Sequence, residues 1–144
     1  MMALRSYQYL QIGSVLAAVL ALGACDLLDS PLASTKDKVV TANQEVLTLV
    51  ETARLGAYSS KSTFNDTATT YGGIIAKLKS ASLDLTPASE DNPRASLVAV
   101  IDACAARVAA LSEQHRRFGL NPKGAYQVTT NDCRLAEIAV KEDI

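Results

Sequence analysis

The chain has 144 residues, of which 49% are hydrophobic, 14 are Lys or Arg and 15 are Asp or Glu. This length suits one domain, and the charge balance lacks the clustered excess of Lys and Arg that nucleic-acid binding requires. The apolar residues are mostly Ala, Val and Leu, with no Trp and only two Phe. Such a composition excludes nucleic acid as an expected partner and favours helices over β-sandwiches.

Residues 1–24 have the pattern of a secretory signal peptide. Arg5 is their only charged residue, and residues 10–24 carry no charge. That run is shorter than the roughly 20 apolar residues that span a bilayer, whereas a positive start, an apolar middle and small residues before a break are typical of a secretory signal. We expect these residues to be removed, which leaves 13 basic and 15 acidic side chains in residues 25–144.

The signal ends in Leu22-Gly23-Ala24-Cys25, which resembles the lipobox of bacterial lipoproteins: an aliphatic residue, two small residues and a cysteine. The resemblance covers residues 1–26. It implies cleavage before Cys25 and a diacylglycerol joined to the thiol, the nucleophilic group available for alkylation. Membrane lipid is then a partner, because two or more acyl chains anchor a protein stably. An uncleaved membrane anchor is the alternative.

Asp26 follows the cysteine directly. Its position resembles the signal that retains enterobacterial lipoproteins in the inner membrane, which implies a protein that faces the periplasm. The inner leaflet of the outer membrane is the alternative. Residues 25–36 include Pro31 and several small polar residues, so they predict a lipidated tether, and residues 37–144 then form the predicted helical domain.

Two apolar stripes predict the first two helices of this domain. The first runs from Val39 to Ala57 at intervals of three and four, and it predicts a helix over residues 37–57. Ser34 and Asp37 are spaced as in a capping box at its start.

The second stripe comprises Phe64, Ala68, Tyr71, Ile75 and Leu78. It contains Gly72-Gly73, and each glycine lowers helix stability by about 1 kcal/mol relative to Ala. We interpret the pair as the site where a neighbouring helix approaches closely.

The third helix has the clearest signal. Asn92-Pro93 resembles an N-cap followed by Pro at the first helical position, and Gly119 and Pro122 predict the end. The apolar stripe between these signals repeats at intervals of four and three. Its members are Leu97, Ile101, Cys104, Val108, Leu111, His115 and Phe118.

The C-terminal segment has a weaker pattern. Residues 121–133 predict a loop with a brief extended piece over residues 126–129. Thr130 or Asn131 would cap a final short helix, and a strand over residues 134–140 is the alternative. The predicted fold is therefore an all-α bundle of three longer helices and a short C-terminal helix. The residues that the short helix would carry are Cys133, Leu135, Ile138 and Ala139.

Two cysteines remain once Cys25 is lipidated. Cys104 and Cys133 can pair in an oxidising compartment, and the pattern favours a structural disulfide. A redox dithiol usually has Cys-x-x-Cys spacing on a βαβ unit, and a zinc site needs four suitable ligands. One histidine and two distant cysteines are a poor match to either alternative, so no metal and no cofactor are expected.

No catalytic residue is predicted. His115 is the only histidine, and Glu113 cannot orient it, because residues two apart on a helix do not face each other. We expect a non-enzymatic envelope lipoprotein that contacts another envelope protein, as an accessory subunit or as an exclusion or immunity factor. The alternative is a ligand-binding or small hydrolytic module with a pocket at Tyr58, Tyr71 and His115.

Overall fold

The computed structural model describes residues 32–86, 94–120 and 125–144, and most of these residues are helical. No β-strand occurs in these ranges, so the prediction of an all-α fold is confirmed. The first element is a helix over residues 32–54, called helix 32–54 below. It is followed by the short 3-10 helix η1 (Lys61–Thr63) and by α2 (Phe64–Asp84), α3 (Ala95–Phe118) and α4 (Ala125–Asp143).

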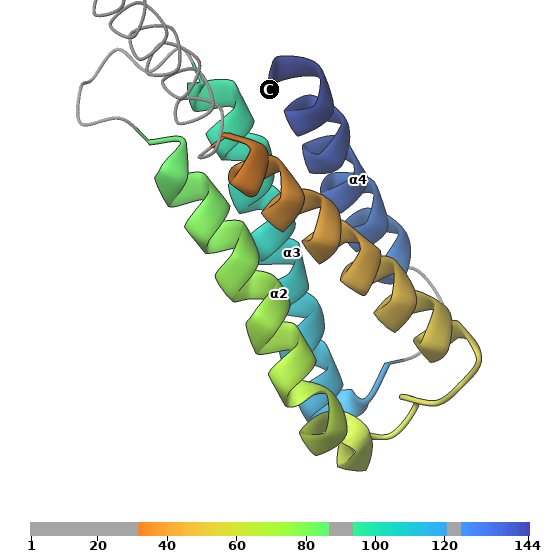
Figure 1. Ribbon diagram of the computed structural model, residues 1–144. Coiled ribbons are helices and arrows are strands. Elements are labelled where there is room, and N and C mark those ends of the chain that lie inside the picture. Colours follow the sequence, from red (N-terminus) through yellow and green to blue (C-terminus); the bar gives the residue numbers. More distant parts are fainter. Residues whose placement is uncertain (1–31, 87–93, 121–124) are drawn as a thin grey trace, which may run out of the picture. The chain divides into compact units, whose positions relative to one another are not determined.

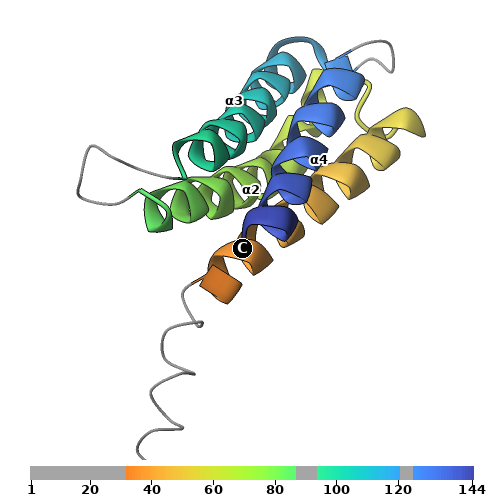
Figure 2. The same ribbon diagram turned by 90° about the horizontal axis from the view of Figure 1, so that it is seen from above.

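The four long helices lie side by side and alternate in direction, so they form an antiparallel bundle (Figure 1 and Figure 2). Thr35, near the start of helix 32–54, donates a hydrogen bond to Asp84 at the end of α2, with 3.1 Å between the two oxygens. On its other side, helix 32–54 is joined to α4 by the Asn43 amide, which donates to Glu137. The first described residues and the C-terminus therefore lie at one end, and η1 lies at the other.

Each long helix turns one apolar face toward a common core. In the described ranges, α3 alone is long and apolar enough to cross a bilayer by length and composition. About one-third of this apolar segment is buried in the bundle. The core residues of the four helices include Val39, Val46, Ala53, Tyr71, Ile74, Leu78, Leu97, Ile101, Val108, Ala136 and Val140.

A disulfide between Cys104 of α3 and Cys133 of α4 links these two helices within the core, as predicted. Both cysteines are at most 1% exposed, and their Cα atoms lie 4.6 Å apart. The bond closes a loop between positions separated by 29 residues. A loop of this length constrains the unfolded chain by about 3–4 kcal/mol in the chain-entropy model, so the disulfide is a main contributor to stability.

The end of α3 is fixed against the loop that precedes η1. Gly119 follows the helix with φ of +78°, and a Cβ there would lie 2.2 Å from the carbonyl oxygen of Ser59. Leu120 N–H donates to the carbonyl oxygen of Tyr58 at 2.6 Å. The predicted end of the third helix is thus confirmed. Phe118, expected on the buried stripe, is instead 76% exposed, because the buried face of α3 ends with His115.

Helix 32–54 begins earlier than the sequence pattern predicts. Residues 32–36 are helical and Thr35 is buried, so this part of the predicted tether belongs to the bundle. Ser34 and Asp37 therefore lie inside the helix, and the expected capping box does not form there. The predicted end is also displaced: the helix stops at residue 54, and Gly56 follows with φ of +89°.

The glycine pair of α2 does not mark a close helix contact, and that interpretation is wrong. Nothing lies within 4 Å of a Cβ built on Gly72 or Gly73. The predicted stripe of α2 is confirmed at Tyr71 and Leu78, which are buried, but the centre of the buried face is displaced by about one residue. Ile74 is fully buried whereas Ile75 is partly exposed.

The C-terminal helix is long, and it replaces three predicted features. α4 spans 19 residues, so neither the extended piece at 126–129 nor the strand at 134–140 is present, and Thr130 and Asn131 are helical rather than caps. Leu135 and Ile138 are 53% and 42% exposed, because the disulfide at Cys133 turns the other face of α4 inward.

Several predictions fall on residues outside the described ranges. These are the signal peptide, the lipidation of Cys25, the tether up to residue 31, and the N-cap at Asn92-Pro93. They stay predictions.

Candidate functional site

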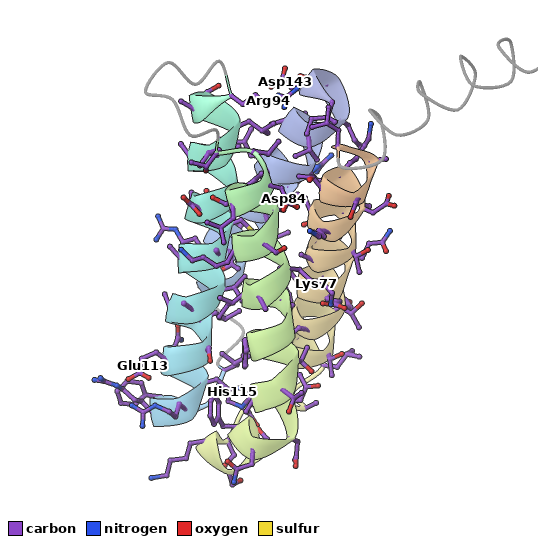
Figure 3. The ribbon with its side chains drawn as sticks, turned by 60° about the vertical axis from the view of Figure 1, so that its left-hand side comes forward. Lys77, Asp84, Arg94, Glu113, His115 and Asp143 are labelled. Carbon is purple, nitrogen blue, oxygen red and sulfur yellow. A yellow bond between two sulfur atoms is a disulfide. The ribbon has the colours of Figure 1, made fainter. Side chains whose placement is uncertain are left out.

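His115 lies in a closed cluster of aromatic rings at the η1 end of the bundle. It is fully buried, and the structure brings it together with Tyr58 and Tyr71, as the alternative hypothesis expected. The ring centroids lie 5.6 Å from His115 for Tyr58 and Phe64, and 5.9 Å for Tyr71. In Figure 3 His115 points inward between α3 and α2, while Glu113 points away from the bundle.

Hydroxyl groups define the tautomer of this imidazole. Thr63 Oγ1 donates its one proton to the carbonyl oxygen of Ser60 at 2.7 Å. It must therefore accept the hydrogen bond that joins it to Nε2 of His115 at 2.9 Å, so Nε2 carries the proton. Nδ1 is then the acceptor atom, and it faces Tyr71 Oη at 3.2 Å and Thr67 Oγ1 at 3.3 Å.

This environment favours the neutral form of His115. Burial lowers the pKa of the imidazole, and a hydrogen bond to the backbone of Ser60 opposes that effect only in part. The groups that surround the ring are phenols, a phenyl ring and hydroxyls, and none of these described contacts is a carboxylate. Both nitrogens are engaged and the ring is inaccessible, so His115 is placed to hold the bundle end together rather than to meet a substrate.

The charged residues around the end of α3 pair with one another on the surface. Arg116 and Arg117 both donate to Glu113 at 2.5–2.7 Å, and these bonds lower the pKa of Glu113 to about 2. Glu113 therefore interacts with arginines and not with His115, in agreement with the helix-spacing argument. The carboxylate of Glu113 thus neutralises part of the positive charge of Arg116 and Arg117.

An open groove lies beside the His115 cluster, between helix 32–54 and α2. Its volume is about 280 Å³, and Tyr58 and Thr67 belong both to its lining and to the contacts of His115. His115 itself does not line the groove. The other lining residues are Thr41, Gln44, Glu45, Thr48, Leu49, Thr52 and Thr70.

The sequence analysis missed this groove. A signal was present, because Thr41, Thr48 and Thr52 are spaced by seven and four and so share one helix face. Apolar periodicity does not detect polar faces, and only the bundle shows that this face meets Thr67 and Thr70 of α2. In the described residues, no group of three or more His, Cys, Asp or Glu side chains is arranged to hold a metal ion.

The described residues thus define a disulfide-linked antiparallel four-helix bundle with a closed histidine cluster and an adjacent groove. No family model, no curated protein and no solved structure matches the chain.

Proposed function

We propose that this protein is a bacterial envelope lipoprotein, anchored in the inner membrane through acylated Cys25, that acts without catalysis by binding another envelope protein. Its helical domain faces the periplasm. The lipobox-like residues Leu22 to Cys25 support the anchor, Asp26 supports the inner membrane, and a disulfide buried in the domain suits an oxidising compartment.

The observation that carries this proposal is the short distance along the chain from Cys25 to the folded unit. The compact unit starts at Leu32, so only residues 26–31 separate it from the lipidated cysteine. A chain extends by at most about 3.3–3.6 Å per residue, which limits the span from Cys25 to Leu32 to roughly 25 Å. A lipid on Cys25 would keep the bundle beside the membrane, within reach of proteins in that membrane.

The closed His115 cluster supports binding over catalysis. General acid–base chemistry requires the catalytic group to reach the proton that it transfers. The only histidine of this chain is fully buried and hydrogen-bonded at both nitrogens. Contact with a partner needs no such group.

Intact-mass measurement of the protein purified from bacterial membranes without reductant tests the anchor. The expected mass lacks residues 1–24, includes acyl chains and is two hydrogens short for the disulfide. The Cys25→Ala variant should remain unacylated. A wild-type protein that is not acylated and keeps residues 1–24 would refute the anchor.

Photocrosslinking in intact cells tests the partner. A photoreactive amino acid is placed in turn at Leu83, Phe118 and Leu135, whose side chains are 53–76% exposed. The wild-type anchor should give one discrete crosslinked product from at least one position, and Cys25→Ala should lose it. A product that is equally abundant with Cys25→Ala would contradict a role of the anchor in partner binding, and the absence of any product at all three positions would count against a protein partner.

A further inference from the structure

The groove between helix 32–54 and α2 offers hydrogen-bond acceptors on two threonines, beside the donors of the Gln44 amide and the Tyr58 hydroxyl. Thr48 Oγ1 donates to the carbonyl of Gln44 at 2.9 Å, and Thr52 Oγ1 donates to the carbonyl of Thr48 at 2.8 Å. On the opposite wall, Thr67 Oγ1 donates to the carbonyl of Phe64 at 3.0 Å and lies 3.3 Å from Nδ1 of His115, so this oxygen belongs to the buried cluster. Each hydroxyl has one proton and two lone pairs, so Thr48 Oγ1 and Thr52 Oγ1 offer only lone pairs to a ligand.

The charge of the groove is balanced. Glu45 is its only charged lining residue. Both carboxylate oxygens accept hydrogen bonds from Lys77 Nζ, at 2.6 and 2.8 Å. An ammonium ligand would have to compete with Lys77, and an anion would meet the carboxylate, so a neutral molecule rich in hydrogen-bond donors fits this surface better than an ion.

An aromatic ring is fixed at the edge of the groove. Tyr58 contacts the buried ring of His115, and its carbonyl accepts from Leu120 N–H. The contact with His115 restricts the phenol ring, so less conformational entropy is lost when a ligand packs against it. An aromatic ring beside acceptor and donor groups matches a ligand with an apolar ring face and hydroxyl groups at its edge.

We propose that this groove binds a neutral sugar, with a ring face packed on Tyr58 and hydroxyls donating to Thr48, Thr52 and Glu45. Its volume of about 280 Å³ is at the lower limit of small-molecule sites, which are about 300–1,000 Å³. The groove therefore accommodates one sugar ring or the end of a longer glycan. This site goes beyond the proposed function and does not depend on the lipid anchor.

Saturation-transfer NMR on the detergent-solubilised full chain tests the proposal. The probes are glucose, galactose and N-acetylglucosamine, with putrescine and glucose 6-phosphate as charged comparisons. At least one neutral sugar should bind saturably with a Kd on the order of 1 mM, which corresponds to a few weak contacts in an open site. Absence of saturable binding by all three sugars, or tighter binding of either charged probe, would overturn the proposal.

A matched pair of variants locates the binding. Thr48→Val combined with Thr52→Val keeps the β-branched shape and removes two acceptors, so affinity should fall about tenfold. Thr86→Val is the control, because Thr86 makes the same bond to the carbonyl four residues back but lies outside the groove. Unchanged affinity in the Thr48/Thr52 variant, with circular dichroism confirming its fold, would refute the groove as the binding site.

Discussion

The two sides of the bundle are held together by different interactions. α3 and α4 are joined by the buried disulfide Cys104–Cys133, with the ion pair Arg107–Asp132 at the surface. Helix 32–54 and α2 are joined by two partly exposed ion pairs, Lys38–Asp84 and Lys77–Glu45, and they border the polar groove. Exposed ion pairs contribute about 0–1 kcal/mol each. Covalent stabilisation is thus located on one side, while the other side borders the polar groove.

Removal of the disulfide should have the largest effect. We expect Cys104→Ala combined with Cys133→Ala to lose about 3–4 kcal/mol of unfolding free energy, because the unfolded chain regains the entropy of the open loop. Urea denaturation of the variant and the wild type, both without reductant, measures this difference. Dithiothreitol should lower the wild-type midpoint and leave the double variant unchanged. A difference below about 1 kcal/mol would contradict a main contribution of the disulfide to stability.

The glycine at the end of α3 connects the two sides, and its substitution should rank second. Gly119→Ala should cost at least about 2 kcal/mol, because φ of +78° is strained for Ala and the new Cβ would overlap the backbone of Ser59. The same denaturation assay measures the loss. Gly72→Ala is the control and should stabilise the fold by about 0.5–1 kcal/mol, since Gly72 is helical and open space surrounds it. Equal effects of the two substitutions would show that the contact with Ser59 is unimportant.

The stability of the bundle should fall in mild acid because of His115. Burial lowers its pKa in the folded state, so the unfolded chain, with an ordinary pKa near 6.5, binds the proton first as pH falls. The His115 contribution is therefore fully present above about pH 7.5. It is lost as pH falls through 6.5 toward the folded-state pKa, at no more than about 1.4 kcal/mol per pH unit. Unfolding free energies at pH 8, 6.5 and 5 measure this slope.

A neutral variant separates His115 from the carboxylates. His115→Gln should be less stable at pH 8 but should show a smaller loss between pH 8 and pH 5 than the wild type. The wild type and the variant both contain Asp84 and Glu137. A hydrogen bond from Lys38 lowers the pKa of Asp84, and a hydrogen bond from Lys141 lowers the pKa of Glu137. These carboxylates lose their stabilising contribution at lower pH in both proteins. Identical slopes between pH 8 and pH 5 would contradict the assignment to His115.

Loss of an ion pair on the groove side should have the smallest effect. Lys77→Met removes the partner of Glu45, and both side chains are about one-third exposed. We expect a loss below about 1 kcal/mol, because water screens the pair. The urea midpoint measures it. A loss of unfolding free energy as large as that of the disulfide variant would contradict the view that the disulfide stabilises the bundle more than this ion pair does.

The sequence by itself predicted the features that depend on local chemistry and composition. The regular apolar spacing of residues 97–115 predicted the buried face of α3, and Gly119 predicted its end because few other residues tolerate its backbone geometry. An expected oxidising compartment, and the fact that only two cysteines remain besides Cys25, predicted that Cys104 and Cys133 pair. These inferences held because each depends on neighbouring residues or on a choice with few alternatives.

The apolar spacing also predicted the buried face of helix 32–54, where Val39, Val46 and Ala53 lie in the core. Tertiary structure decided the exact buried face of α2 and α4 and where the polar groups meet. Ile74 and Ile75 have equal hydrophobicity, and only packing against α3 and helix 32–54 selects Ile74 for the core. The disulfide likewise leaves Leu135 and Ile138 exposed. His115 and Tyr71 meet in one cluster although they are 44 positions apart in the sequence. Thr48 and Thr67 come from two different helices and line the same groove only in the folded chain. Local periodicity carries no information about such pairs, because the antiparallel packing of whole helices sets their alignment.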